Sequence, residues 1–315
     1  METRPDLEAR VAKPSASSRK IRGYAEVTHE TESGVLEQVV AQRGRLERRL
    51  ASVGAVIAIA SGKGGVGKSA ITANLAVALA DRGARVGVVD ADLNGPSLGR
   101  MLGLLGARPL DGPDGLVPPT GSRGVVGIST ELLLEQDAAL RWRGPDGDRF
   151  VWQGVTEAGV LREFLGDVVW GELDYLLVDI PPGTDKIGRF LDLVPDPAQV
   201  ILVTIPSRVA VSVVARSASL LEDAGVDEVG LVVNMAGYTP AGADEPVPLF
   251  HGDGAGAVSE SIGLELWARI PFDPELGART DEGDPPGARA AAAGEALRGL
   301  AERVERGPGG RERAR

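Results

Sequence analysis

The chain has 315 residues, with 45 acidic and 34 basic side chains and a formal net charge of −11. Its length allows one large hydrophobic core or two small ones, and the excess of acid argues against broad, non-specific binding of nucleic acid. No apolar run reaches the roughly 18 residues of a membrane span, and the N-terminal stretch lacks the apolar segment of a signal peptide. We therefore expect a cytoplasmic protein with neither a membrane nor a nucleic acid as partner.

Cysteine is absent and lysine is scarce. Without cysteine the chain has no disulfide, no thiolate nucleophile and no cysteine-ligated metal site. Only 5 of its 34 basic residues are lysines. Two of them, Lys63 and Lys68, lie in one glycine-rich loop. This clustering indicates that they serve a functional site and not merely the solubility of the protein.

The chain begins with a polar stretch. Residues 1–35 are rich in Pro, Ser and mixed charge, so we expect a disordered leader. Apolar residues recur at helical spacing over 36–52, which predicts a helix docked on the core, with a basic partner-binding helix as the alternative. A P-loop ATPase domain is expected over 53–305, and a disordered tail over 306–315.

From residue 53 onward, short apolar runs alternate with amphipathic segments. The runs predict strands buried on both faces, over 55–61, 85–90, 173–180, 199–206, 229–234 and 266–271. The amphipathic segments predict helices over 69–81, 156–165, 208–224 and 288–304. This alternation predicts an α/β fold, a mostly parallel twisted sheet with helices on both faces. Residues 104–150 are expected to be an irregular insertion with a short hairpin around Val117 and Val126.

A phosphate loop follows the first expected strand. The stretch GKGGVGKS satisfies the pattern G-x-x-x-x-G-K-[ST] and opens an expected helix. Glycines let successive backbone N–H groups turn inward, and the helix N-terminus adds positive potential. We expect Lys68 to reach the β- and γ-phosphates and the Ser69 hydroxyl to ligate Mg²⁺. The expected nucleotide-binding residues of the loop are Gly62, Lys63, Gly64, Gly65, Val66, Gly67, Lys68, Ser69 and Ala70.

Two later strands are expected to end in aspartate. Asp90 closes one strand, with Asp92 just beyond it, and Asp179 closes another. Ligands of open α/β sheets bind at the carboxyl ends of the strands. We therefore expect Asp92 to orient and polarise an attacking water, and Asp179 to hold Mg²⁺ directly or through water.

The second lysine of the loop distinguishes a subclass. GKGGVGKS resembles the deviant Walker A loop of the MinD/ParA-like (SIMIBI) ATPases. The resemblance implies a dimer in which Lys63 reaches the phosphates of the partner's nucleotide, much as an arginine finger does. The alternative is an exposed loop lysine without a role in catalysis.

Further motifs follow in a fixed order: DADLNGPS, LLVDIPPGTD, VVNM and IPFDPELG. With the loop they resemble the Mrp-type (ApbC-like) ATPases, which carry or assemble iron–sulfur clusters, over about residues 55–305. The resemblance implies that Asp92 is the switch I aspartate and that Asn234 hydrogen-bonds adenine. It also implies a switch II segment at Pro181, Pro182 and Gly183, and a base pocket lined by Pro271 and Asp273.

The sequence departs from that family at three places. Ala70 replaces a second hydroxyl residue after the lysine, and Asp185 with Lys186 breaks the usual G-T-G-D order. The family's C-P-x-C falls near YTPAGADEP (238–246), which has Pro240 and Ala243 instead. Cluster ligation in that family uses those cysteines, so the resemblance also implies that this chain cannot hold a cluster by the same means.

Taken together, these motifs predict a slow, Mg²⁺-dependent ATPase that forms a homodimer with ATP at the interface and serves an unidentified client. ATP is preferred over GTP on the strength of Asn234 and because no N-K-x-D motif is present. His251 is expected to be a solvated loop residue; the alternative is a divalent-ion site with Asp244, Glu245 or Asp253. Two other functions stay open: a MinD/ParA-like positioning or partitioning ATPase, and an ATP-gated adaptor for a partner protein.

Overall fold

The computed structural model describes residues 35–93, 95–134, 142–143, 149–150, 157–194, 196–243, 245–251 and 254–307. The chain divides into two compact units, 1–41 and 42–315. The leader expected over 1–35 and most of the expected tail lie outside the described residues. The helix expected over 36–52 corresponds to α2 (Val35–Leu50).

The larger unit is built on one parallel sheet of seven strands, in the order β11-β10-β9-β1-β8-β2-β5. Every neighbouring pair in this sheet is parallel, which confirms the predicted fold class. The strands are β1 (Val53–Ala60), β2 (Val86–Asp90), β5 (Val126–Ser129), β8 (Leu173–Asp179), β9 (Gln199–Thr204), β10 (Val229–Val233) and β11 (Glu265–Arg269).

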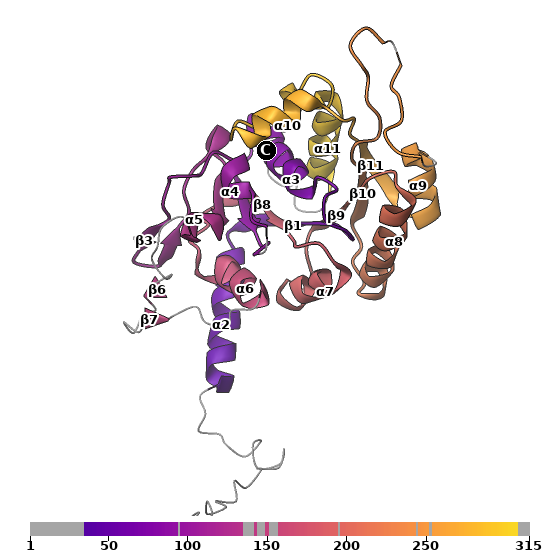
Figure 1. Cartoon of the computed structure of the whole chain (residues 1–315). Coiled ribbons are helices and arrows are strands. Elements are labelled where there is room, and N and C mark those ends of the chain that lie inside the picture. The colour runs from indigo at the N-terminus through magenta and orange to yellow at the C-terminus, as the bar shows by residue number, and fades with distance from the viewer. Residues whose placement is uncertain are drawn as a thin grey trace, which may run out of the picture. The chain divides into compact units, whose positions relative to one another are not determined.

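Helices cover both faces of the sheet (Figure 1). One layer contains α3 (Lys68–Asp81), α10 (Pro274–Asp281) and α11 (Gly294–Arg306). The other contains α6 (Glu157–Asp167), α7 (Thr184–Leu193), α8 (Arg208–Asp223) and α9 (Gly254–Ile262). The short helices are α4 (Leu98–Met101), α5 (Glu131–Leu134), η1 (Ser122–Gly124) and η2 (Gly287–Arg289).

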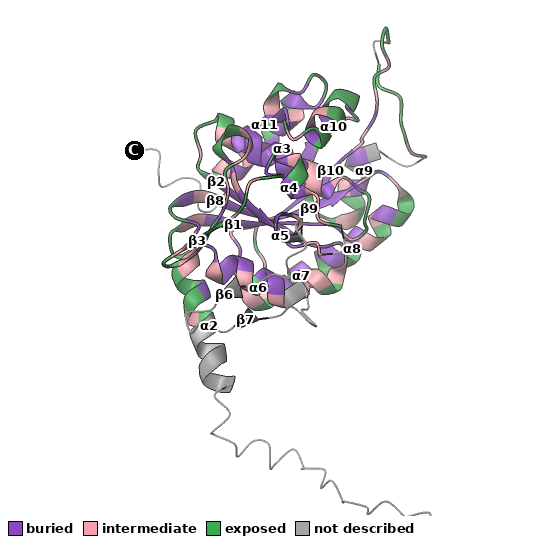
Figure 2. Cartoon of the chain, turned by 60° about the vertical axis from the view of Figure 1, so that its left-hand side comes forward, coloured by how far each residue is buried: buried purple, intermediate pink, exposed green. Residues whose placement is uncertain are grey.

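Alternate residues of β1 face opposite layers, as the pleat of a strand requires. Ile57 and Ile59 belong to the core beneath α3 and α11, whereas Val56 and Ala58 belong to the core beneath α6, α7, α8 and α9. Both sets are buried, and Figure 2 shows the buried strands running between the two helical layers. This burial explains why the strand sequences are almost continuously apolar.

The region 104–150 differs from its prediction. The hairpin joins β3 (Leu110–Gly112) to β4 (Gly115–Val117), so Val117 pairs with Leu110 and not with a strand near Val126. Val126 begins β5, which extends the main sheet by pairing in parallel with β2. The expected hairpin around Val117 and Val126 is present in part, because Val126 forms an antiparallel bridge with Thr120. The open edge of β2, which local sequence does not reveal, also draws Val126 into the main sheet. A second two-stranded ladder joins β6 (Trp142–Arg143) to β7 (Arg149–Phe150).

The helices differ from the predicted set at several places, because α7, α9 and α10 were not predicted and one predicted helix is interrupted. α7 was not predicted, since its short segment buries only Ile187 and Phe190. The helix expected over 288–304 is interrupted between η2 and α11. The interruption has a physical cause, because the Asp273 carboxylate accepts the backbone N–H groups of Ala292 and Ala293 at 2.8 and 3.1 Å. In the part of the chain that is described, no helix is both long and apolar enough to cross a membrane.

Candidate nucleotide site

The candidate site lies where β1, β8 and β2 end side by side. The register pairs Ile59 of β1 with Asp179 of β8, and Asp179 with Asp90 of β2. The phosphate loop leaves β1 at this edge and enters α3 at Lys68. The three segments that carry the expected site residues are therefore brought together by strand order alone, as the rule for open parallel sheets predicts.

The loop has a backbone that requires glycine. Gly65 and Gly67 have φ angles of 79° and 81°, in the left-handed region that side chains disfavour. A Cβ on Gly67 would also lie 2.3 Å from Asn234 Nδ2. Val66 between them is buried. The loop is thus held in a curved conformation in which backbone N–H groups can gather around an anion.

Lys68 is the buried cation of the site, with 6% of its surface exposed. Its Nζ lies 2.5 Å from Asp179 Oδ2. The ammonium makes no hydrogen bond of good geometry to the rest of the described protein. A buried ammonium with unused donors is costly unless a further acceptor arrives. These residues therefore fit a phosphate group of a nucleotide.

Asp179 is the centre of the site and is fully buried. Beyond Lys68, its Oδ2 accepts the Ser69 hydroxyl at 2.6 Å and its Oδ1 accepts the Thr72 hydroxyl at 2.7 Å. The sequence analysis did not single out Thr72. Its signal was present, since position 72 lies one helical turn after Ser69 and on the same face of α3. Hydroxyl and carboxylate oxygens are the donor set that Mg²⁺ prefers, so the group fits that ion.

Asp90 supports the neighbouring loop. It is almost fully buried, and burial together with the charge of Asp179 raises its pKa to about 6. Its Oδ2 accepts the backbone N–H groups of Ser97 and Leu98 and the Ser129 hydroxyl at 2.9 to 3.0 Å. Asp90 therefore ties three segments together at the carboxyl end of β2.

Asp92 lies on the loop that Asp90 holds. Its backbone N–H donates to Asp90 Oδ1 at 3.1 Å, and its own Oδ1 accepts the Gly95 N–H at 3.1 Å. Asp92 is half-buried. The loop geometry places this carboxylate beside the strand end that carries Asp90, and its role toward water stays a prediction.

Asn234 links the strand β10 to the phosphate loop. Its backbone N–H donates to Thr204 O at 2.8 Å, and its Nδ2 donates to Val66 O at 2.9 Å. The side chain is buried. This contact gives Asn234 a structural role at the loop that the sequence analysis did not foresee, and the adenine contact remains a prediction.

Asp273 caps α10 and joins it to the segment before α11. Oδ1 accepts the backbone N–H groups of Glu275 and Leu276 at 3.1 and 3.2 Å, while Oδ2 accepts those of Ala292 and Ala293. These hydrogen bonds outweigh burial and hold its pKa below the usual range. Both carboxylate oxygens are thus committed to the backbone, so Asp273 positions the segment that carries Pro271. The base contact of either residue is untested.

The expected switch II segment contacts the phosphate loop. The Gly183 N–H donates to Ser61 O at 3.0 Å, and Gly183 has a φ of 126°, which a side chain rarely adopts. Pro182 lies 3.7 Å from the position that a Cβ on Gly64 would take. Pro181 is buried. A movement of either loop would therefore displace the other.

Lys63 is exposed, in contrast to Lys68. The loop around it is fixed, since its carbonyl oxygen accepts the Ser61 hydroxyl at 3.1 Å. No carboxylate of the described residues forms an ion pair with its ammonium. The side chain can therefore extend away from its own subunit. The hypothesis that Lys63 acts on the nucleotide of a partner requires such an extension.

Comparisons with known proteins agree with this geometry. A family model described as the NUBPL iron-transfer P-loop NTPase, of the ParA group, matches residues 52–305. The iron-sulfur cluster carrier protein of Methanocaldococcus jannaschii is 36% identical over 245 residues, which cover 78% of this chain and 81% of that protein. The cytosolic Fe-S cluster assembly factor NUBP2 of Bos taurus is 37% identical over 74% of this chain and 85% of that protein. The chain belongs to the NUBPL iron-transfer family.

Solved structures place the fold of this NUBPL-family chain among nucleotide-binding ATPases. A nucleotide-binding protein from Archaeoglobus fulgidus, solved with ADP, is 34% identical with a TM-score of 0.64, covering 76% of this chain and 91% of that one. The cell division ATPase MinD of Pyrococcus furiosus is 26% identical with a TM-score of 0.54, covering 80% and 98%. The resemblance derived from the motifs is thereby confirmed.

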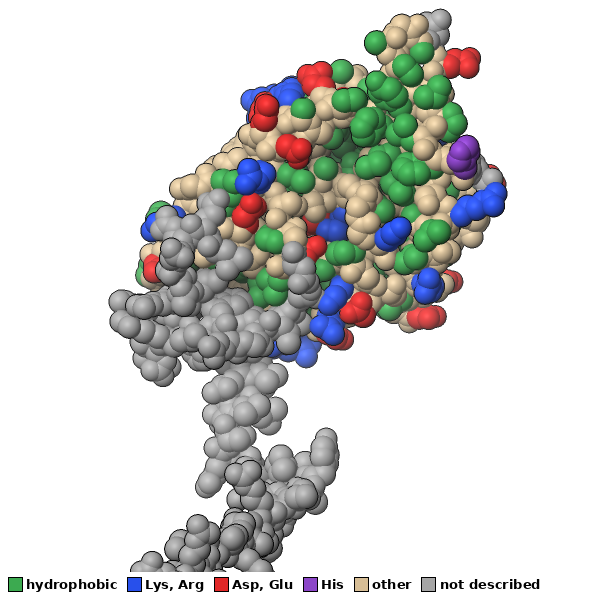
Figure 3. Space-filling model, in the orientation of Figure 1, with side chains coloured by type: hydrophobic (Ala, Val, Ile, Leu, Met, Phe, Trp, Pro, Cys, Tyr) green, Lys and Arg blue, Asp and Glu red, His purple; other side chains and the backbone are tan. Residues whose placement is uncertain are grey.

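The NUBPL-family chain differs from the expected pattern in the loop between β10 and α9. Tyr238 and Val247 pair as an antiparallel bridge, and the Tyr238 ring meets that of Phe272 edge-on at 5.8 Å. Val247 and Leu249 are exposed. Figure 3 shows apolar side chains gathered on this face, and His251 is exposed. The loop presents apolar side chains, whereas a cluster would require thiolate sulfur.

No group of three or more His, Asp or Glu side chains suited to a metal occurs among the residues that are described. The alternative divalent-ion site around His251 involved Asp244 and Asp253, which lie outside the described residues. That alternative therefore stays untested.

Proposed function

We propose that this NUBPL-family protein is a Mg²⁺-dependent ATPase that works as a dimeric switch without ligating an iron–sulfur cluster itself. The observation that carries the proposal is the arrangement around Asp179. A buried lysine with unused donors, two hydroxyl groups and a glycine loop of fixed curvature converge on one carboxylate. The names of the cytosolic relatives support a place in the cytoplasm.

Binding begins with the phosphate loop. Backbone N–H groups of the loop would surround the β-phosphate. The ammonium of Lys68 would move away from Asp179 toward the β- and γ-phosphate oxygens. Ser69 and Asp179 would hold Mg²⁺, which supplies charge neutralisation on those oxygens when bound. Because Thr72 and Ser69 both donate to Asp179, the carboxylate stays oriented while its lysine partner moves away.

Hydrolysis needs an oriented water and a cation opposite the developing charge. Asp92 lies on a loop tied to Asp90, where it would orient the water for in-line attack. In a dimer with nucleotide at the interface, Lys63 of each subunit would stabilise the transferred phosphoryl group of the other. Loss of that group would change the environment of switch II, which contacts the phosphate loop through Gly183 and Ser61, and could thereby alter the dimer surface.

Ligand chemistry supports the part of the proposal that concerns the cluster. Iron–sulfur clusters are held by cysteine thiolates, and the 315 residues include none. We therefore assign to this chain the nucleotide-driven step of the family's work, in the service of a client that supplies the thiolates.

The positioning ATPase remains the second candidate, on the strength of the similarity to MinD. A membrane-bound form would need an amphipathic anchor, and α11 is an amphipathic helix near the C-terminal end of the described residues. Leu297, Leu300 and Val304 of α11 are fully buried in the core, so this helix cannot serve as that anchor without unfolding the domain. Co-sedimentation with liposomes or DNA in the presence of ATP tests this second function.

The decisive experiment combines a measurement of ATP turnover with a measurement of molar mass in solution. Phosphate release is measured with Mg²⁺ and with EDTA, and light scattering follows the Asp92→Ala variant with ATP or ADP. We expect metal-dependent turnover in the wild type and a stable dimer of the variant with ATP only. A monomer under every condition, or turnover equal in EDTA, would refute the proposal.

A further inference from the structure

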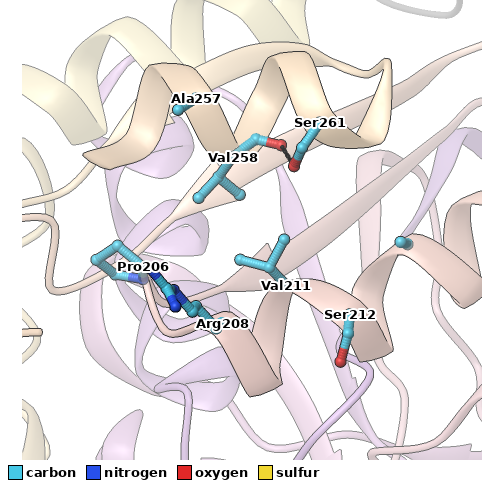
Figure 4. A pocket seen from close by; sticks show the side chains of 8 residues that line it. Pro206, Arg208, Val211, Ser212, Ala257, Val258 and Ser261 are labelled. Carbon is cyan, nitrogen blue, oxygen red and sulfur yellow. Dashed lines mark hydrogen bonds between the residues drawn. The ribbon is translucent and has the colours of Figure 1, made fainter. Parts of the chain in front are cut away.

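A pocket of about 370 Å³ lies between α8 and α9, apart from the nucleotide site. Its floor is apolar, and Figure 4 shows Val211 of α8 and Val258 of α9 projecting toward each other. Ala215 and Ala257 complete this floor. The volume is at the small end of the roughly 300 to 1,000 Å³ of ligand pockets, so the pocket suits one or two side chains.

The polar groups of the pocket are few and mostly engaged. The Ser212 hydroxyl donates to Val209 O and the Ser261 hydroxyl to Val258 O, each at 2.9 Å within its own helix. Arg208 is therefore the polar side chain of the lining with donors left to offer. Polar recognition in this pocket falls to a guanidinium, which binds carboxylates in a two-pronged manner.

The charge around the pocket is unbalanced. Arg82, Arg85 and Arg303 each pair with carboxylates within 3.5 Å, as is common in a chain of net charge −11. Arg208 and Arg216 have no carboxylate partner among the described residues, and Arg216 donates to Ser212 O at 3.4 Å. The acidic residues on the two helices, Glu222, Asp223 and Glu260, do not line the pocket.

We propose that the α8–α9 pocket docks a partner protein through a short segment with an apolar side chain beside carboxylates. The apolar side chain would occupy the floor between Val211 and Val258. The neighbouring carboxylates would pair with Arg208 and, about two turns along α8, with Arg216. Charge complementarity with the two arginines favours an acidic segment; a second copy of the chain, which is also acidic, is an alternative outcome of the test.

The opposite side of α8 contacts the nucleotide machinery. A Cβ on Gly62 would lie 2.7 Å from Val213 Cγ1 and 2.9 Å from its backbone carbon, so the phosphate loop lies directly against this helix. The Ser217 hydroxyl lies 3.3 Å from that of Thr184, which follows the switch II glycine. One rigid helix thus contacts the pocket, the phosphate loop and switch II. Docking is coupled to nucleotide through α8; this coupling rests on the proposed function, whereas docking does not.

The test uses the full chain and fluorescence anisotropy with two labelled hexapeptides. The first has two leucines flanked by glutamates, and the second has lysines in place of the glutamates. We expect the acidic peptide to bind the nucleotide-free protein at least tenfold more tightly than the basic one. Equal binding of the two peptides, or no binding up to millimolar concentration, would overturn the proposal.

Variants locate the binding. Arg208→Glu and the pocket-filling Ala215→Trp should each weaken binding of the acidic peptide at least tenfold, while Arg298→Glu, at an exposed position of α11, should change its affinity less than twofold. Arg298 is the matched control because it too lacks a carboxylate partner among the described residues. Each variant must still bind fluorescent ADP, which shows that it is folded. Wild-type peptide affinity in both folded pocket variants would refute the site.

Two further measurements distinguish a partner protein from a second copy of the chain and test the coupling to nucleotide. If Ala215→Trp dissociates an otherwise stable dimer in light scattering, the pocket belongs to a second copy and the partner proposal fails. For the coupling, peptide affinity should differ at least threefold between ATP and ADP, and the difference should vanish in Lys68→Ala. Equal affinity in both nucleotides would remove the coupling and leave the docking site standing.

Discussion

The centre around Asp179 and the loop between β10 and α9 stand at the carboxyl edge of the same sheet, yet their side chains differ in kind. At the first, a buried lysine and two hydroxyls converge on one carboxylate. At the second, a bridge between Tyr238 and Val247 carries exposed apolar side chains and no thiol. One set of groups can bind a charged phosphate and a hard cation, while the other offers none of the cysteine thiolates that hold iron–sulfur clusters. The two regions therefore differ in the kind of ligand that their side chains can bind.

The largest effect is expected from the cation at the first region. Lys68→Ala removes the main charge from a buried cradle and leaves Asp179 without its partner, so nucleotide binding should be lost. Binding of fluorescent ADP measures this, with circular dichroism to confirm the fold. ATP turnover at the wild-type rate in this variant would disprove the phosphate-loop assignment.

The exposed lysine should affect turnover and spare binding. Lys63→Ala should bind ATP normally but hydrolyse it about 10³-fold more slowly, the scale of other cations that act across an interface. Mixing Lys63→Ala with Asp92→Ala creates dimers in which one site has its own Asp92 and a Lys63 from the partner. Such heterodimers should regain part of the activity. A lack of rescue, with heterodimers demonstrated, would place Lys63 outside catalysis in trans.

Asp90 should make the first region sensitive to pH. Its folded pKa is raised from 3.8 to about 6, so the folded state binds more protons than the unfolded state between these values. Stability contributed by this group is therefore highest at low pH and falls as pH rises toward 6, by up to about 3 kcal/mol at 1.36 kcal/mol per unit. Urea unfolding of wild type and Asp90→Asn from pH 4 to 7 measures the difference. A gap between the two that does not change with pH would contradict the expectation.

A smaller effect is expected from the hydroxyl that sequence analysis missed. Thr72→Val keeps the shape of the side chain but removes one hydrogen bond from the buried Asp179, which should cost about 1–3 kcal/mol of unfolding free energy. Because the carboxylate of Asp179 is held less firmly, the variant should also lose more affinity for Mg²⁺-ADP than for ADP alone. Ser219→Ala, on the exposed side of α8, is the control and should change neither quantity.

The second region should show no effect at all. After anaerobic reconstitution with iron and sulfide, the protein should remain colourless and hold no stoichiometric cluster, because it offers no cysteine. Absorbance near 400 nm and iron analysis measure this, with a cysteine-bearing relative as positive control. A stable absorbance with about four irons per dimer, as in a Cys₄ cluster, would require ligands of another kind.

The sequence by itself determined the elements and the chemical inventory. Glycine spacing identified the phosphate loop, apolar runs identified six strands of the sheet, and the absence of cysteine decided what metal chemistry is impossible. These are local or compositional properties, so they can be read without knowing the fold. The carboxylates at strand ends could be placed together because parallel strands share one edge.

Only the tertiary structure decided how those groups are supported. Thr72 meets Asp179 across 107 positions, and Asn74 accepts the Gly287 N–H across 213. The open edge of β2 drew Val126 into the sheet, and Asp273 broke the expected helix by binding two backbone N–H groups. Such contacts depend on which strands and helices become neighbours, a long-range choice set by burial of the two cores, and no local spacing in the sequence encodes it.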